Sequence, residues 1–193
     1  ARNSGIAAAR HDILAIIDDD MFVAANWFGS LIRALLKSGQ RAVVTGRVLP
    51  TESEVPGGFV PALVLNDAPA TYAGRIGVDV LAGGHMAAHR AVFDEVGNFD
   101  ERLGPGADFP AAEDNDLGFR LLEAGFRIVY APEAIVYHRA WRGKREYLGM
   151  RWSYGRGKGG FYSKYLSLRD PYMLRRMIWD IVHRFGIFPY RIC

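Results

Sequence analysis

The stretch "ILAIIDDDMFV", residues 13–23, places three adjacent aspartates directly after five apolar residues. A short apolar run of this kind is typical of a strand that is buried on both faces of a parallel sheet. Adjacent carboxylates repel one another, so Asp18, Asp19 and Asp20 gain no stability from sharing a strand end. Ligands of open α/β sheets bind beyond the carboxyl ends of strands. We therefore interpret the cluster as a site for a positively charged ligand rather than an acidic surface turn.

The segments on either side of this stretch predict alternating helices and strands. Ala7–Arg10 is expected to end a helix, and residues 26–39 carry apolar positions at helical spacing, with Asn26 as N-cap and Gly39 as the stop. Ala42–Leu49 is expected to form a second strand. The order helix, strand, acidic turn, helix, strand indicates an α/β fold with right-handed crossovers.

The downstream half continues this pattern after an irregular connection. Proline and glycine interrupt residues 51–80, where we expect a long loop with at most one short element. Beyond it we predict further elements: a helix over 90–96 ended by Gly97, a helix opening with Glu113 and Asp114 and ended by Gly125, and strands over 127–131 and 134–138 around Pro132.

Charge divides the chain into two parts. Up to His138 there are 11 Lys and Arg against 18 Asp and Glu, a net charge of −7, whereas residues 139–193 hold 13 against 3, a net charge of +10. Base-reading motifs are missing, so nucleic acid is not an expected partner. The one cysteine excludes a disulfide scaffold and is consistent with a cytoplasmic location. No apolar run approaches about 18 residues, so no transmembrane helix is predicted.

Two groups of carboxylates are candidates for chemistry. Asp18 and Asp20, two residues apart, can point the same way and hold Mg²⁺ or Mn²⁺, which take oxygen ligands and commonly a substrate diphosphate. Glu113 and Asp114 open a helix behind a Gly/Pro loop, where one of them could act as a general base, although simple helix capping by Asp114 or Asp116 is the alternative. A metal-dependent phosphatase or nucleotidyltransferase that uses Asp18 and Asp20 stays open beside a transferase.

Five blocks occur in an order that resembles a known family: "ARNSGIAAAR", "IIDDDMF", "LAGGHMAAHRAVFDEVGNFDERLG", "AEDNDLGFRLLEAGFRIVYAPEAIVYH" and a basic aromatic tail. Together they resemble the family-2 glycosyltransferases of GT-A fold over roughly residues 1–138. The resemblance implies an α/β fold with a mixed sheet flanked by helices, a catalytic core over 1–138 and a helical tail over 139–193. It also implies that the chain lacks the family's first strands, and we expect this chain alone to bind donor poorly and to be inactive.

The resemblance assigns roles to individual residues. It makes Asp114 the catalytic base with Glu113 beside it, and Asp20 the main metal ligand. The remaining assignments are Asp18 near the nucleotide ribose or the metal, Arg2 and Asn3 near the nucleotide, Gly83 and Gly84 along the sugar and acceptor pocket, Phe99 and Asp100 before the acceptor loop, and His138 near the metal or diphosphate.

The implied reaction is an inverting, metal-dependent transfer of a sugar from a UDP-, GDP- or dTDP-sugar to a hydroxyl of a glycan, lipid-linked or cell-envelope acceptor. A non-catalytic glycan-binding domain is the third alternative. In the tail, residues 170–185 predict a helix that either packs on the domain or contacts the inner face of the cell membrane from the cytoplasm. The stretch "YGRGKGG", residues 154–160, is expected to be a flexible lid or link.

Overall fold

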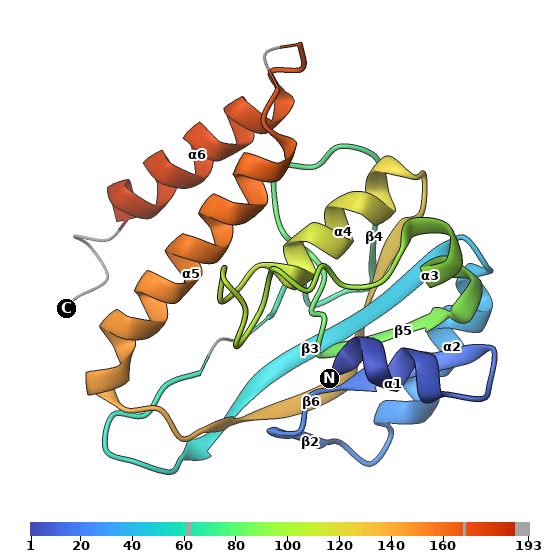
Figure 1. Cartoon of the computed structure of the whole chain (residues 1–193). Coiled ribbons are helices and arrows are strands. Elements are labelled where there is room, and N and C mark those ends of the chain that lie inside the picture. Colours follow the sequence, from blue (N-terminus) through green and yellow to red (C-terminus); the bar gives the residue numbers. More distant parts are fainter. Residues whose placement is uncertain (61–62, 168, 188–193) are drawn as a thin grey trace.

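The computed structural model describes residues 1–60, 63–167 and 169–187, and it forms a mixed sheet with helices on both faces (Figure 1). The strands are β1 (Ile13–Ile17), β2 (Met21–Val23), β3 (Ala42–Ser53), β4 (Ala70–Tyr72), β5 (His85–His89) and β6 (Arg127–Ala140). The helices are α1 (Arg2–Ala8), α2 (Trp27–Ser38), α3 (Arg90–Val96), α4 (Glu113–Glu123), α5 (Lys144–Tyr165) and α6 (Tyr172–Ile187). The predicted mixed α/β fold class is confirmed.

The strand order is β1-β5-β3-β6-β2, and β4 pairs with β6 beside this path. Only β3 and β6 run parallel among the described strand pairs. Side chains alternate across the sheet. Val44 and Ala87 pack on the same side as Leu31 of α2, whereas Val43 and Met86 pack on the other side. That second face is covered by helix α4, whose Leu117 and Leu121 are fully buried.

Helices α2, α3 and α4 confirm the predictions from apolar spacing and glycine stops. The predicted bounds of α3, residues 90–96, match the observed helix, and the predicted end of α1 lies near its observed last residue, Ala8. Gly39 and Gly97 follow α2 and α3 with φ of 77° and 79°, a conformation that glycine adopts without the steric cost of a Cβ. In the long connection, β4 is the one short strand among residues 54–60 and 63–80.

The prediction that β1 is buried within a parallel sheet was wrong. Strand β1 pairs antiparallel with β5, and it lies at the end of the described strand order. Leu14 is buried, but Ala15 and Ile17 are exposed. The apolar run therefore predicted the strand but not the direction of its pairing with β5.

The two strands predicted around Pro132 are one continuous strand, β6. Its pairing with β3 shifts between Gly46↔Ala131 and Arg47↔Ile135, which leaves three residues of β6 outside the ladder. Pro132 lies in that irregularity, where a residue without an N–H costs no ladder hydrogen bond. A Cβ on Gly46 would overlap the carbonyl oxygen of Ala134, so the glycine makes room for the bulged backbone.

Residues 154–160 do not form the predicted flexible lid, because they lie within the 22-residue helix α5. Glycine normally weakens a helix, but here it permits close packing. A Cβ on Gly157 would lie 2.5 Å from the carbonyl oxygen of Ala111, and one on Gly160 would lie 2.5 Å from the Phe109 ring. The glycines therefore bring α5 onto the segment that precedes α4.

Helices α5 and α6 lie side by side as an antiparallel pair against the α4 side of the molecule (Figure 1). Phe161 of α5 and Met173 of α6 are buried together with Ala112 in a separate apolar cluster. Strand β6 continues past His138, the predicted boundary between core and tail, to Ala140. Within the described residues, we find no helix whose length and hydropathy would let it cross a bilayer.

Candidate active site

The end of β1 brings Asp18 against the glycine pair that precedes β5. The Asp18 N–H donates to the carbonyl oxygen of Gly84 over 3.0 Å. A Cβ on Gly84 would overlap the Asp18 carboxylate, so only glycine leaves room for this carboxylate. On the next residue, a Cβ on Gly83 would lie 3.0 Å from Cβ of Asp114. The two predicted pocket glycines thus lie between Asp18 and Asp114, and all four residues share one site.

Arg2 joins the two acidic groups of this site. Its Nη2 donates to both oxygens of Asp18, at 2.7 and 2.8 Å, and its Nη1 donates to Glu113 at 2.7 Å. Burial would lower the pKa of Arg2, but the carboxylates of Asp18 and Glu113 outweigh burial and raise it. A bidentate Arg–carboxylate pair is among the strongest side-chain interactions. Arg2 therefore holds the end of β1 to the start of α4.

Asn3, predicted beside Arg2 as a nucleotide contact, uses its amide to hold the backbone of Phe99. Its Nδ2 donates to the Phe99 carbonyl oxygen at 2.9 Å, and its Oδ1 accepts from the Phe99 N–H at 3.1 Å. Phe99 is buried, and the guanidinium carbon of Arg2 lies 5.4 Å from its ring centroid. The amide of Asn3 thus fixes a neighbour of the site.

Asp20 diverges from Asp18 and faces the end of β6. Its Oδ1 lies 3.7 Å from Nε2 of His138, and its carbonyl oxygen accepts the Arg139 N–H at 3.0 Å. Asp19 between them is exposed. No three His, Cys, Asp or Glu side chains converge as metal ligands within the described residues. The Asp20 carboxylate nevertheless suits Mg²⁺ or Mn²⁺, since these ions take oxygen ligands and commonly complete their shell with water and phosphate oxygens.

Asp114 lies in the first turn of α4, and its backbone approach is unusual. Ala112, the residue before α4, has φ 74° and ψ 15°, and it is the one non-glycine residue with positive φ in the described part of the chain. Such conformations cost on the order of 1 kcal/mol or more and concentrate at functional sites. The N-cap residue Ala112 has no capping side chain, and Asp114 accepts the first-turn N–H of Asn115 at 2.8 Å, so its carboxylate also serves the start of α4.

The environment of Asp114 favours its protonated form. Burial, followed by the charges of Glu113 and Asp79, raises the pKa of Asp114 to about 7, against opposing contributions from the Asn115 N–H and Arg2. A carboxylate with a pKa near neutral pH is well matched to accept a proton from a hydroxyl. The geometry and charge of the site therefore single out Asp114 among the acidic residues.

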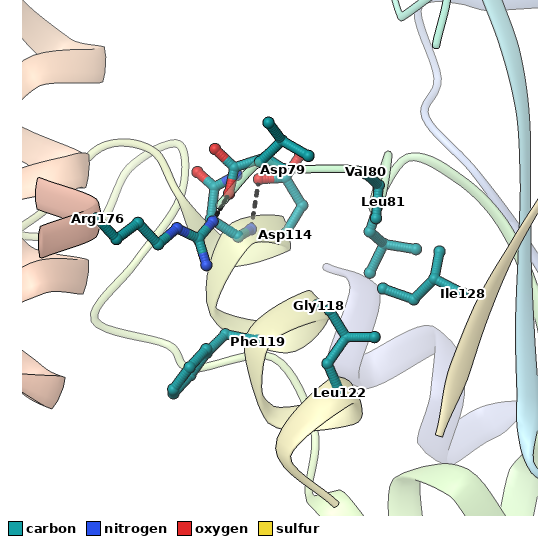
Figure 2. A pocket seen from close by; sticks show the side chains of 11 residues that line it. Asp79, Val80, Leu81, Asp114, Gly118, Phe119, Leu122, Ile128 and Arg176 are labelled. Atoms are coloured by element: carbon teal, nitrogen blue, oxygen red, sulfur yellow. Dashed lines mark hydrogen bonds and ion pairs between the residues drawn. The ribbon is translucent and has the colours of Figure 1, made fainter. Parts of the chain in front are cut away.

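Residues far along the chain complete the wall of this site, and the sequence did not identify them. Asp79 is bound by Lys158 of α5 and by Nη2 of Arg176 of α6, the latter at 2.5 Å. Figure 2 shows Arg176 reaching toward Asp79 and Asp114 above α4. Asp79, Asp114 and Arg176 border a cavity of about 10 Å³, which has room for roughly one water molecule. Leu81 and Phe119 also line this cavity.

The carboxylates of the site act on the phenol of Tyr154 in α5. Burial raises the pKa of its phenol despite an opposing effect of Arg142, and the carboxylates of Asp114, Glu113 and Asp20 raise it further. The only sequence sign of these contributions was the basic, aromatic character of the tail, which does not indicate which charges pair. The tail helices thus supply Tyr154, Lys158 and Arg176 to the surroundings of Asp114.

Residues 1–155 match the model of a family described as glycosyltransferase like family 2. The chain belongs to this family. A "Pre-mycofactocin glycosyltransferase" of Mycobacterium tuberculosis is 30% identical over 159 residues, which cover 80% of this chain and 33% of that protein. An "N-acetylglucosaminyl-diphospho-decaprenol L-rhamnosyltransferase" of the same organism is 45% identical over 58 residues, covering 30% of this chain and 17% of that protein.

Membership of family 2 agrees with the architecture. The solved structure titled "Crystal structure of GalNAc-T7 with UDP, GalNAc and Mn2+" superimposes with a TM-score of 0.52 at 18% identity, covering 74% of this chain and 30% of that one. This likeness confirms the predicted GT-A fold. The present chain spans about a third of the length of the first curated relative, so the activity of the whole protein is a matter for proposal.

Proposed function

We propose that this chain carries catalytic residues of an inverting glycosyltransferase that moves a sugar from a nucleotide-diphosphate donor to an acceptor hydroxyl. The observation that carries the proposal is the single cluster formed by Asp18, Gly84, Gly83 and Asp114, in which the Asp114 pKa is raised to about 7. Its location in a family-2 chain supports the same conclusion.

Asp114 is the proposed base. It accepts the proton of the acceptor hydroxyl while that oxygen forms a bond to the anomeric carbon of the donor sugar. The bond from the anomeric carbon to the diphosphate oxygen breaks in the same displacement, so the configuration inverts and a nucleoside diphosphate leaves. Gly83 presents only backbone beside Asp114, and this close approach positions the base against the loop before β5.

Asp20 and His138 are the proposed metal ligands. A divalent Mg²⁺ or Mn²⁺ would stabilise the negative charge on the departing diphosphate. Both oxygens of Asp18 are bound by Arg2, and this favours a positioning role toward the donor over direct ligation for Asp18, although its metal role stays a prediction. The same contact disfavours the phosphatase alternative, which needs the Asp18 carboxylate as a nucleophile.

The donor nucleotide is proposed to be UDP, GDP or dTDP, with Arg2 and Asn3 on its side of the site, and the acceptor a glycan, lipid-linked or cell-envelope hydroxyl. A nucleotide-sugar donor and a single cysteine favour a cytoplasmic location.

The decisive experiment is Asp114→Asn in the longest natural form of the protein, with sugar transfer and donor binding both measured. We expect turnover to fall by at least about 10³-fold while donor affinity changes little, because the amide keeps the shape but cannot accept the proton. Turnover close to that of the unaltered protein would refute the assignment of the base. Asp116→Asn is unsuitable as a control, because Asp116 is a fully buried acceptor for Arg120, Lys164 and Tyr165.

A further inference from the structure

Helix α6 packs Met173 against the domain together with two charged side chains, and it leaves a stripe of apolar side chains exposed. A surface helix of a water-soluble domain normally buries its apolar stripe and exposes its charges. Here the buried side chains include Arg176, which is 6% exposed, and Asp180 lies partly buried beside Lys158. The apolar side chains that point outward form what we call the outer face of α6: Leu174, Ile178, Ile181 and Val182, which are 37, 51, 46 and 61% exposed.

Specific contacts fix this rotation of the helix. Arg176 donates to Asp79, and the Tyr162 hydroxyl donates to Asp180 at 2.5 Å. Met173, one turn before Arg176, is 2% exposed within the cluster that includes Phe161. Turning α6 to bury Ile178 would break both polar contacts and expose Met173. The apolar surface is therefore a stable feature of the fold.

The part of the chain that carries the outer face is basic, although Arg139, Lys158, Lys164 and Arg176 in it are paired with carboxylates of the domain. Residues 139–193 contain 13 basic and 3 acidic residues. Three of the four tryptophans lie exposed in this part of the chain: Trp141, Trp152 and Trp179, at 43, 72 and 57%. Tryptophan concentrates at membrane interfaces, and basic side chains near a bilayer are attracted to anionic lipid headgroups.

We propose that the outer face of α6 lies on an anionic membrane surface, with α6 parallel to the bilayer plane. The apolar side chains enter the boundary between headgroups and acyl chains, and exposed basic side chains such as Arg175 remain among the headgroups. A second copy of the chain is a poorer occupant of this face, because pairing would bring together two chains that each carry a net charge of +3.

The inner side of the same helix reaches the candidate active site. Arg176 holds Asp79, whose charge acts on Asp114, so a membrane-bound α6 would place this site close to the lipid surface. If the proposed function is correct, the acceptor is therefore one that the membrane itself presents, such as a lipid-linked sugar. This step rests on the proposed function, whereas membrane binding does not.

Vesicle flotation of the 193-residue chain tests the inference without any measure of turnover. The vesicles are pure phosphatidylcholine or phosphatidylcholine with 30 mol% phosphatidylglycerol, roughly enough negative charge to imitate an anionic leaflet. The test variant is Ile178→Gln with Val182→Gln, since glutamine keeps helix propensity. The control variant is Phe28→Gln with Leu36→Gln on α2, two side chains of similar exposure, at 60 and 61%. Circular dichroism verifies the fold of each.

We expect the unaltered chain and the α2 control to float with anionic vesicles, less so in high salt, and the α6 variant to bind at least about tenfold more weakly. Absence of flotation would overturn the proposal, as would equal binding of the α6 variant. Self-association that the α6 variant abolishes, without vesicle binding, would assign the face to a second copy. Flotation of the 193-residue chain but not of the longest natural form would show that protein covers the face.

Discussion

Nη2 of Arg2 donates to both carboxylate oxygens of Asp18, and Nη1 of the same side chain donates to Glu113. The Arg2 side chain is 22% exposed, and that of Glu113 is 12% exposed, so solvent screens these ion pairs only in part. One guanidinium therefore ties α1 to the end of β1 and to the start of α4. Lysine cannot reproduce this fork, because its charge sits on a single nitrogen.

We predict that Arg2→Lys lowers the free energy of unfolding by about 1–3 kcal/mol, because a carboxylate loses its charge-assisted partner. Thermal unfolding followed by circular dichroism measures the change. The matched control is Arg139→Lys, since Arg139 also binds a carboxylate, Glu54, with two nitrogens but at an exposed position. Exposed pairs contribute little, so the control should unfold at the unaltered temperature. Equal effects of the two changes would contradict the proposed importance of Arg2.

The pH dependence of turnover should report the Asp114 carboxylate. Because the base must be ionised and its pKa is raised to about 7, we expect kcat/KM to rise with pH and to level off above about 7. Asp79→Asn removes a negative charge that raises this pKa, so the acidic limb should move to lower pH. Asp67→Asn, at a side chain that is 98% exposed, should leave the limb in place. An unchanged midpoint in Asp79→Asn would contradict the coupling.

Asp114→Asn should also change stability in a pH-dependent way. An acid whose pKa is raised by folding destabilises the native state as pH increases from the ordinary value of 3.8 toward about 7, and the cost is complete above that. Asparagine removes this cost. We therefore expect the variant to gain melting temperature relative to the unaltered chain at pH 8, by about 3 °C or more, and to gain less at pH 5. A gain independent of pH would show that ionisation of Asp114 is not its cause.

The proposed metal site assigns a ligand role to Asp20 but not to its neighbour Asp19. Asp20 faces His138 at 3.7 Å, whereas Asp19 is exposed. We predict that Asp20→Asn raises the Mn²⁺ concentration for half-maximal turnover by at least about tenfold, since a neutral amide replaces a charged ligand. Asp19→Asn should leave that concentration unchanged. The result that would refute the assignment is a larger effect at Asp19 than at Asp20.

Two glycines of α5 provide a paired test of its packing. Gly155→Ala meets no atom within 4 Å, and we expect it to stabilise the chain by about 0.5–1 kcal/mol through helix propensity. Gly157→Ala would place Cβ 2.5 Å from the backbone of Ala111, and we expect it to destabilise by roughly 1–3 kcal/mol through overpacking. Chemical denaturation measures both. Equal shifts of the same sign would mean that α5 does not pack closely on this segment.

Local patterns predicted the parts of the fold that local forces determine. Apolar spacing and glycine stops located α2, α3 and α4, and the apolar run before Asp18 gave the bounds of β1. The antiparallel pairing of β1 with β5 joins residues more than 60 positions apart, and nothing in residues 13–17 specifies that partner. The helical state of residues 154–160 was missed because the stabilising contacts of its glycines lie outside the segment, on Phe109 and Ala111.

The candidate site likewise contains residues that the sequence predicted and residues that it could not predict. The family motifs pointed to Asp18, Gly83, Gly84 and Asp114, and the structure brings these residues together. The triad of Asp79, Lys158 and Arg176 could not be predicted, because each residue alone resembles an ordinary solvated charge. Helical phase did identify the apolar and charged faces of α6, but it could not show which of their side chains the domain would bury.

The left-handed conformation of Ala112 determines which substitutions this position accepts. Alanine here looks replaceable, since it is small, apolar and without a chemical role, and any apolar residue would suit its buried surroundings. At φ 74°, however, a β-branched side chain would be far costlier than alanine, whereas glycine would relieve strain. Glycine would also free the peptide that aims Glu113 and Asp114. Alanine at position 112 therefore costs some stability, but it keeps the backbone rigid just before Asp114, the proposed base.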